Sequence, residues 1–253
     1  MPNPAVAQQL QVTAPLVPSR QNYVIVRLVR IPLACVMERD AKKKQKVEPA
    51  PAPRRILFIG NSFTARNDVP GLIADMARQR GFQVQTELVS RGGASLKQHW
   101  NAGALGMHEK DPFDAVVLQE QSTLPAKNEA RFHDNVRLFA KAVTNAQLVL
   151  YSTWARADEP EKQQSITDAY ARIAAEARAR VAPVGSAFAA LQAAGVALHD
   201  KDKSHANMLG SYVAACVFFA TIFGQSPVGL ECAKIKDKLV LEQLQQAAAK
   251  AAL

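Results

Sequence analysis

From residue 54 onward, short apolar runs alternate with longer stretches in which apolar residues recur at helical spacing. Strands separated by helices form βαβ units, so the pattern predicts an α/β fold: a three-layer α/β/α sandwich with about five parallel strands. The predicted strands are residues 55–59, 83–89, 115–119, 147–152 and 181–184. The predicted helices are residues 69–80, 129–144, 159–180, 186–194, 208–223 and 234–251.

The first 53 residues differ from the rest of the chain in composition. They are rich in proline, and a lysine cluster runs into a Pro/Ala stretch that ends at Pro53. Such a composition buries too little apolar surface to offset chain entropy, so we expect residues 1–53 to be a disordered leader or linker and residues 54–253 to form one domain. The first 55 residues contribute +7 of the formal net charge of +9. The body is therefore nearly neutral, and no nucleic-acid partner is predicted.

One apolar patch, residues 23–37, interrupts the leader. It is short and broken by Arg27 and Arg30, so no integral membrane span is predicted. Its basic flank and the stretch Leu33-Ala34-Cys35 are similar to an export signal or a lipoprotein cleavage region, which would make the protein periplasmic or lipid-anchored. The alternative is that Met37 or a nearby codon is the true start and the protein is cytoplasmic. The sequence leaves both open, and it gives no oligomeric state.

A serine follows the first predicted strand, in Phe58-Ile59-Gly60-Asn61-Ser62-Phe63-Thr64. This position places the Ser62 hydroxyl at the carboxyl edge of the sheet, where open α/β folds bind ligands. It also places the Ser62 N–H near a helix N-terminus, where anionic charge is favoured. A nucleophile is expected there. The alternative is an ordinary turn in which Ser62 caps the helix.

Acyl transfer by a serine needs a base for the hydroxyl proton, an acidic group that orients the base, and donors for the developing oxyanion. Ser62 would attack, His205 would take its proton, and Asp202 could hold the imidazole tautomer. The backbone N–H groups of Ser62 and of Gly92 or Gly93 are the expected oxyanion donors, because a glycine lets the substrate approach closely. The alternatives are that His205 only precedes a helix and that Asp202 is a solvated loop acid.

The other loops after the predicted strands supply further candidates. Gln119, which ends the apolar run of the third strand, is the favoured third oxyanion donor; Gln121 is the second choice, and either glutamine could instead be structural. Asn61, Gly92 and Trp154 are candidate substrate-binding residues; the alternatives are that Gly92 belongs only to a turn and that Trp154 packs in the core. No metal and no organic cofactor is predicted, because the spacing of the acids and imidazoles near residue 200 fits no ligand pattern. Those residues are His199, Asp200, Asp202 and His205.

These residues resemble the blocks of the SGNH (GDSL-type) hydrolases, over about residues 54 to 230. The stretch from Gly60 to Thr64 is similar to the first block, with Asn61 where many members have aspartate. Gly93, or its neighbour Gly92, resembles the glycine of the second block. Asp202 and His205 resemble the final block.

The third block departs from the family pattern. The family usually has Gly-x-Asn-Asp, with asparagine as an oxyanion donor, whereas this chain has Gln119-Glu120-Gln121-Ser122. That stretch is more similar to the glutamine-bearing variants among carbohydrate-directed esterases.

The resemblance implies a flavodoxin-like SGNH hydrolase fold and a serine esterase that works through an acyl-enzyme without a cofactor. It implies a small-molecule or carbohydrate ester as substrate, with a short acyl or O-acetyl group on carbohydrate as the first choice and a lipid or aryl ester as the second. Two other classes remain. One is a non-catalytic domain that binds a glycan or a partner in the same crevice. The other is a nucleotide binder, which the single glycine and the missing lysine of residues 60–64 disfavour.

Overall fold

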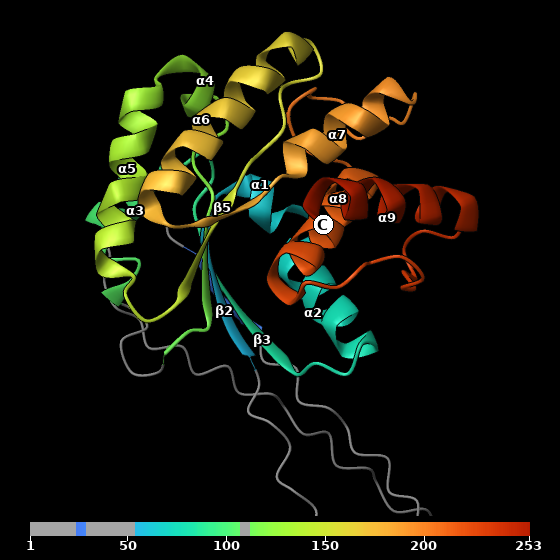
Figure 1. The fold of residues 1–253 in the computed structure, drawn as a ribbon, viewed down its shortest axis with the longest axis horizontal. Helices are drawn as coiled ribbons and strands as arrows, with labels where there is room; N and C mark the ends of the chain where they lie inside the picture. The colour runs from blue at the N-terminus through green and yellow to red at the C-terminus, as the bar shows by residue number, and fades with distance from the viewer. Residues whose placement is uncertain (1–23, 29–53, 107–111) are drawn as a thin grey trace, which may run out of the picture.

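The computed structural model describes residues 24–28, 54–106 and 112–253 (Figure 1). They contain one six-stranded sheet of order β1-β3-β2-β4-β5-β6, in which β1 is antiparallel to β3 and the other five strands are parallel. The α/β prediction of about five parallel strands is confirmed. The strands are β1 (Val24–Leu28), β2 (Arg54–Gly60), β3 (Val84–Ser90), β4 (Ala115–Leu118), β5 (Gln147–Tyr151) and β6 (Arg180–Ala182).

Helices cover both faces of the sheet. In Figure 1, α3, α5 and α6 lie on one side of the strands, and α2, α7, α8 and α9 lie on the other. The helices are α1 (Ser62–Ala65), α2 (Val69–Gln79), α3 (Leu96–Asn101), α4 (Leu124–Lys127), α5 (Glu129–Ala142), α6 (Gln163–Ala177), α7 (Val184–Ala193), α8 (Met208–Phe223) and α9 (Lys238–Ala252). Two 3-10 turns, η1 (Arg66–Asp68) and η3 (Pro160–Lys162), precede α2 and α6.

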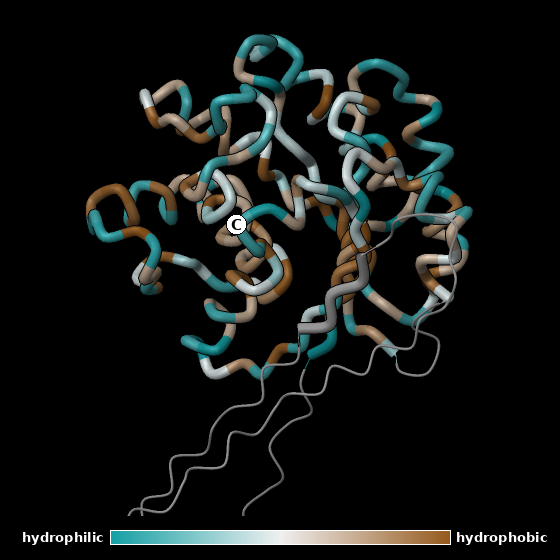
Figure 2. Tube along the Cα trace, turned by 180° about the vertical axis from the view of Figure 1, so that it is seen from behind, coloured by the Kyte–Doolittle hydropathy of each residue, from teal (hydrophilic) through white to brown (hydrophobic). Residues whose placement is uncertain are grey.

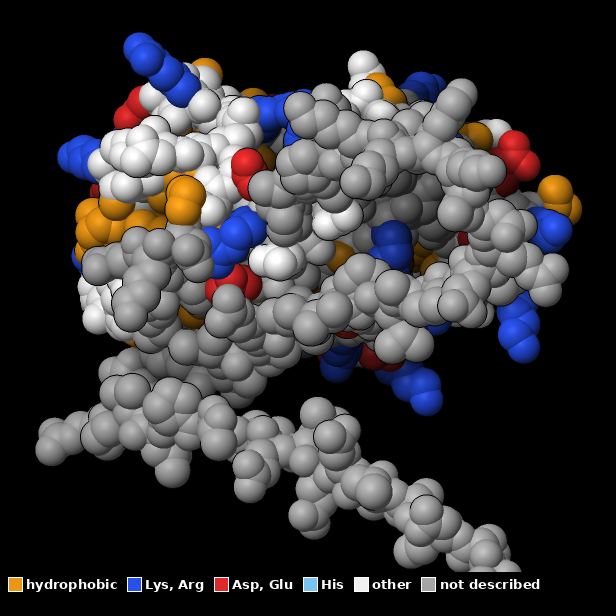
Figure 3. Space-filling model, turned by 90° about the horizontal axis from the view of Figure 1, so that it is seen from below, with side chains coloured by type: hydrophobic (Ala, Val, Ile, Leu, Met, Phe, Trp, Pro, Cys, Tyr) orange, Lys and Arg blue, Asp and Glu red, His pale blue; other side chains and the backbone are white. Residues whose placement is uncertain are grey.

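Alternating side chains of the strands build two cores, because successive residues of a strand point to opposite faces. Ile56 and Phe58 of β2 belong to the cluster under α2, α7, α8 and α9, whereas Leu57 and Ile59 belong to the cluster under α3, α5 and α6. The central strands are accordingly among the most hydrophobic parts of the chain trace (Figure 2). On the face seen in Figure 3, Lys and Arg side chains lie beside Asp and Glu side chains.

Helix α8 is apolar on all sides because it is enclosed by protein. It packs against α2, α7 and α9, and twelve of its residues are buried. Within the residues described by the structure, no helix has both the length and the apolar character needed to cross a bilayer.

Some of the helix and strand boundaries predicted from the sequence differ from those in the structure. The helix predicted at 159–180 begins as η3, continues as α6 and ends at Arg178, which has φ 50°. The strand predicted at 181–184 ends at Ala182, because Pro183 has no N–H for the ladder and caps α7 instead. The helix predicted from residue 234 begins at Lys238, after the Asp237 carboxylate accepts two backbone N–H groups as its cap.

Residues 1–53 were expected to be disordered, but one segment of them forms a strand. Val24–Leu28 forms β1, with Val24 opposite Ser90 and Leu28 opposite Thr86 of β3. The physical reason is that β3 would otherwise be an open edge, and the β-branched run Val24-Ile25-Val26 is suited to pair with it. The remainder of residues 1–53, including the signal-like Leu33-Ala34-Cys35, lies outside the described residues.

Removing β1 should therefore affect the domain. We expect deletion of residues 1–53 to lower the thermal midpoint by about 2–4 °C for each kcal/mol of lost pairing, and to promote self-association through the exposed edge of β3. Deletion of residues 1–21, which keeps β1, is the matched control. Calorimetry and light scattering check both variants. Equal midpoints for the two deletions would show that β1 contributes nothing to stability.

Candidate active site

Ser62 is the first residue of α1, directly after the carboxyl end of β2. Asn61 precedes it as the helix cap, and its Oδ1 accepts the Phe63 N–H at 3.1 Å. The chain needs glycine at position 60, because a Cβ there would lie 2.7 Å from Oε1 of Gln119 and 2.8 Å from Oγ1 of Thr64. The turn that presents Ser62 is therefore packed closely against Thr64 of α1 and Gln119, the residue that follows β4.

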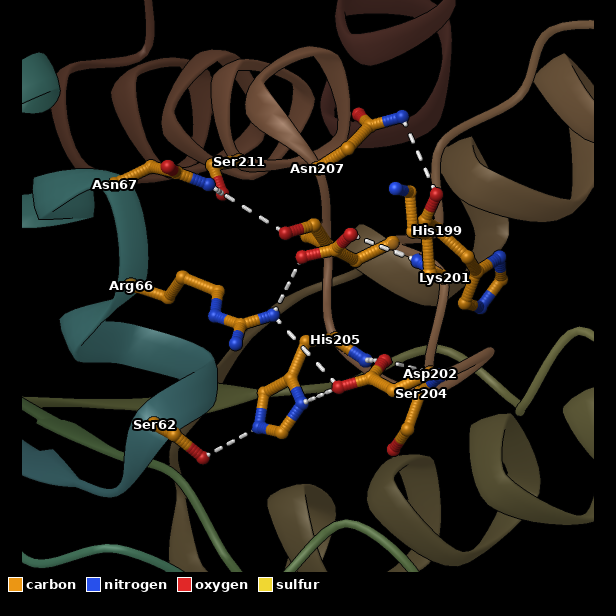
Figure 4. Close-up of polar contacts among 12 residues, drawn as sticks. Ser62, Arg66, Asn67, His199, Lys201, Asp202, Ser204, His205, Asn207 and Ser211 are labelled. Atoms are coloured by element: carbon orange, nitrogen blue, oxygen red, sulfur yellow. Dashed lines mark hydrogen bonds and ion pairs between the residues drawn. The ribbon is translucent and has the colours of Figure 1, made fainter.

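The structure brings the three predicted triad residues together (Figure 4). Ser62 Oγ lies 2.8 Å from Nε2 of His205, and Nδ1 of His205 lies 2.5 Å from Oδ2 of Asp202. A proton on Nδ1 that donates to the carboxylate leaves Nε2 as the acceptor for the serine hydroxyl. This is the arrangement a general base needs.

The Asp202 carboxylate also organises its own loop. Its Oδ1 accepts the backbone N–H groups of Ser204 at 3.0 Å and His205 at 2.9 Å. The hydrogen bond from the His205 ring, followed by these two backbone bonds, holds the pKa of Asp202 well below its usual range. Asp202 therefore stays ionised in mild acid, where it can orient the imidazole.

That depressed pKa determines the expected pH profile. A general base has to be unprotonated to act, and the Asp202 carboxylate is still charged in mild acid, so Asp202 adds no ionisation of its own to the acid side of the profile. We expect the logarithm of kcat/KM for an ester to fall on the acid side with a slope of one. Initial rates across a pH series check this expectation, and a slope of two would mean that two ionisations, and not one, control the rate on the acid side.

Arg66 lies beside the triad acid. Its Nη1 is 2.9 Å from Oδ2 of Asp200 and 3.7 Å from Oδ2 of Asp202 (Figure 4). Arg66 belongs to η1, which follows the nucleophile helix, so this contact joins the element that carries Ser62 to the loop that carries His205.

A strained turn at Asn67 and Asp68 provides a second contact between η1 and the segment around His205. Asn67 and Asp68 have φ of 58° and 57°, a left-handed conformation that costs on the order of 1–3 kcal/mol for each such residue. In this conformation Asn67 Nδ2 donates to Ser211 Oγ at 2.9 Å and to the Ala206 carbonyl at 3.4 Å. Sequence reasoning missed this turn. The available signal was an Asn-Asp pair, since these residues tolerate the left-handed region best after glycine.

A row of aromatic rings packs against the His205 imidazole. Phe63 lies edge-on to the His205 ring at 5.3 Å between centroids and stacks on Trp154 at 4.7 Å, and Trp154 stacks on Phe188 at 4.2 Å. The Trp154 Nε1–H donates to the Ser204 carbonyl at 2.8 Å. Trp154 is thus buried and holds the loop that carries His205.

The glycine loop after β3 is tied to the nucleophile turn. Gly93 has φ 65°, which favours glycine, and Ala94 donates to the Arg91 carbonyl at 3.1 Å to close the turn. Asn61 Nδ2 donates to the Ala94 carbonyl at 3.0 Å. Asn61 is only 2% exposed and both ends of its amide are engaged, so the structure gives it a positioning role and not the expected contact with substrate. Gly92 is exposed on this loop.

Gln119 was expected to face the crevice, but its side chain is buried. It is 0% exposed; its Oε1 accepts from the Asn61 N–H at 2.8 Å and the Thr64 hydroxyl at 3.1 Å, and its Nε2 donates to the Glu120 carbonyl at 2.5 Å. The choice of Gln119 as oxyanion donor is wrong for this reason. Gln121 is half-buried, and its Oε1 accepts from the N–H and hydroxyl of Thr123. Among the described residues, no group accepts from the Gln121 Nε2.

Two buried groups that were not assigned roles from the sequence hold these loops. Glu120 is fully buried, and its carboxylate accepts from Leu96 N–H at 3.0 Å, Gln121 N–H at 2.7 Å and Asn135 Nδ2 at 2.8 Å. Burial raises the pKa of Glu120. His99 is also buried, and its Nε2–H donates to the Gly60 carbonyl at 2.7 Å; burial lowers its pKa and favours the neutral ring.

The side chains considered for a metal site point to different partners. The His199 Nε2–H donates to the Ala155 carbonyl at 3.0 Å, and burial lowers the pKa of His199. Asp200 pairs with Arg66, and Asp202 with His205. Within the described residues, no group of three or more His, Cys, Asp or Glu is placed to hold a metal ion.

The sheet, the serine at its carboxyl edge and the Asp-x-x-His loop define a hydrolase-type α/β domain, and comparison with solved structures identifies the family. A candidate SGNH hydrolase from Slackia heliotrinireducens is 30% identical, with a TM-score of 0.59 over 68% of this chain and 100% of that chain. The protein belongs to the SGNH hydrolase family, as the sequence resemblance predicted.

More distant structures share the fold. A DUF4886 family protein from Bacteroides uniformis is 18% identical, with a TM-score of 0.66 over 79% of this chain and 95% of that chain. An acetylxylan esterase from Geobacillus stearothermophilus is 14% identical, with a TM-score of 0.54 over 70% of this chain and 95% of that chain. No protein-family model and no curated protein matches the chain.

Proposed function

We propose that this protein is a serine esterase that hydrolyses its substrate through an acyl-enzyme. The observation that carries the proposal is the continuous hydrogen-bonded path from Ser62 through His205 to Asp202. His205 Nε2 takes the proton as Ser62 Oγ attacks the ester carbonyl, and it then returns that proton to the leaving alcohol. A water activated by the same nitrogen hydrolyses the acyl-enzyme. The intact path disfavours a domain that only binds a glycan or a partner.

The oxyanion in this mechanism is held by the backbone N–H groups of Ser62 and Gly93 together with the Gln121 amide. Ser62 lies at the start of α1, and Gly93 lies on an exposed turn that Asn61 ties to the nucleophile. We assign this role to Gln121 in place of Gln119. The Nε2 of Gln121 donates to no group in the part of the chain that the structure describes, whereas the Nε2 of Gln119 donates to the Glu120 carbonyl.

The two glutamines should respond differently to replacement by alanine. Gln121→Ala should lower kcat by roughly a hundredfold to a thousandfold with little change in KM, since an oxyanion donor acts in the transition state. Gln119→Ala should lower the thermal midpoint, because it leaves the buried Asn61 N–H without its acceptor. Steady-state kinetics and thermal unfolding of both variants test the assignment. A rate near that of the wild type for Gln121→Ala would leave the oxyanion to the backbone donors.

The substrate we propose is an ester with a short acyl group, such as an O-acetyl group on a carbohydrate. A pocket with about 350 Å³ of empty space, including its mouth, is lined by Phe63, which follows Ser62 in the chain and whose ring contacts His205. Its apolar floor includes Phe63, Trp154 and Ile166, which would suit a small acyl group better than a long chain. The likeness to the acetylxylan esterase fold points in the same direction.

A panel of p-nitrophenyl esters of graded acyl length, run beside acetylated sugars, tests this function. We expect the highest kcat/KM for acetyl or another short group, and hydrolysis of at least one acetylated sugar. Ser62→Ala is the control for background hydrolysis. A preference for long acyl chains would overturn the substrate assignment while leaving the serine mechanism in place.

A further inference from the structure

The pocket that Phe63 lines has buried apolar residues as its floor and more exposed charged residues as its rim. Phe63, whose ring contacts His205, forms part of the floor and lies next to Ser62 in the chain. Three cationic side chains and one carboxylate line the same pocket: Lys127, Arg156, Lys162 and Glu159. The rim therefore carries more positive than negative charge, whereas the body of the protein is nearly neutral.

Two of the three cations already have anionic or carbonyl partners. Lys162 pairs with Glu159, so these two charges offset each other. Arg156 contacts Oδ1 of Asp158 at 3.3 Å and donates to the Asp202 carbonyl at 3.4 Å, which makes it part of the wall that holds the triad loop.

Lys127 is different. It is the last residue of α4, it is exposed, and its ammonium forms no ion pair with any of the residues that the structure describes. A partnerless cation at the mouth of a pocket attracts an anion without first breaking an existing pair. The apolar floor suits the acyl group, and the part of the substrate that extends past the rim is then its alcohol portion.

We propose that the alcohol portion of the substrate carries a carboxylate, as in an acidic sugar, and that Lys127 binds it. The inference rests on the proposed esterase function and narrows its substrate class. Lys127 acts in binding and takes no part in the proton transfers between Ser62 and His205.

A matched pair of esters tests the proposal: 4-acetoxybenzoate, which is anionic, and 4-acetoxybenzamide, which is neutral and of similar size. The quantity compared is the ratio of kcat/KM for the anionic ester to that for the neutral one. Lys127→Ala should lower this ratio by roughly fivefold to tenfold, and Lys127→Glu should lower it further, because a charge-assisted contact is lost and then replaced by repulsion. Lys141→Ala on α5, outside the pocket, should leave the ratio unchanged. Added salt should lower the wild-type ratio through screening.

Binding to the inactive protein separates this proposal from the esterase function. Calorimetric titration of Ser62→Ala should show tighter binding of 4-acetoxybenzoate than of 4-acetoxybenzamide, and the additional Lys127→Glu change should reverse the preference. A ratio that is the same in wild type, Lys127→Ala and Lys127→Glu overturns the anion site while the esterase function stands. A charge preference in binding without any turnover keeps the anion site and refutes the esterase.

Discussion

Replacing Ser62 by alanine should abolish ester hydrolysis and leave the fold intact. The substitution removes the attacking oxygen, and loss of a triad nucleophile can lower kcat on the order of a millionfold. The substitution removes the hydrogen bond between Ser62 and the His205 ring, and the free energy of unfolding should change by no more than about 0.5 kcal/mol. Initial rates with the best ester and thermal unfolding of the same preparation check both statements.

Ser186→Ala on α7 is the matched control, since it removes a serine hydroxyl away from the triad. It should retain the wild-type rate. If Ser62→Ala keeps more than a few per cent of the wild-type rate, Ser62 is not the nucleophile.

Replacing His205 by alanine should be about as damaging as replacing Ser62, because it removes the imidazole that lies 2.8 Å from the Ser62 hydroxyl and would take its proton. The two residues act as one unit in the proposed mechanism. The double variant Ser62→Ala/His205→Ala should therefore be no slower than Ser62→Ala alone, and single-turnover assays at high enzyme concentration can compare the residual rates.

His199→Ala is the control for this second prediction. His199 lies on the same loop but bonds to the Ala155 carbonyl, so its loss should lower the rate much less than the loss of His205. Losses that multiply in the double variant would argue against a single catalytic unit.

Much of this fold could be predicted from the sequence, because its signals are local. The apolar runs at residues 55–59, 83–89 and 115–119 mark strands β2, β3 and β4, and β2 pairs in parallel with both of the others, in keeping with the predicted parallel sheet. Ser62 could be placed at the sheet edge because the turn-forming residues Gly60 and Asn61 end an apolar run that reads as a strand. The pairing of Asp202 with His205 could be predicted because both lie within one short loop.

The features that could not be predicted depend on distant partners. The Gln119 side chain turns inward because its Oε1 accepts a hydrogen bond from the Asn61 N–H, which is 58 residues away in the chain. The left-handed conformation of Asn67 is held by Ser211 and Ala206 of a distant segment. Strand β1 forms because β3 presents an edge, and nothing near residues 24–28 in the sequence reveals that edge.

The 143 residues that separate Ser62 from His205 tie the chemistry of this protein to the completion of its fold. The base loop lies between α7 and α8, and α8 is enclosed only when α2 and α9 have packed around it. A chain that has formed β2 and the Ser62 turn still lacks the base until His205 has come into contact with Ser62. Because contacts so distant in sequence are slow to form, a nascent or partly refolded chain carries an inert serine. Enzymatic activity therefore reports on the assembly of the whole domain more strictly than its helix content does.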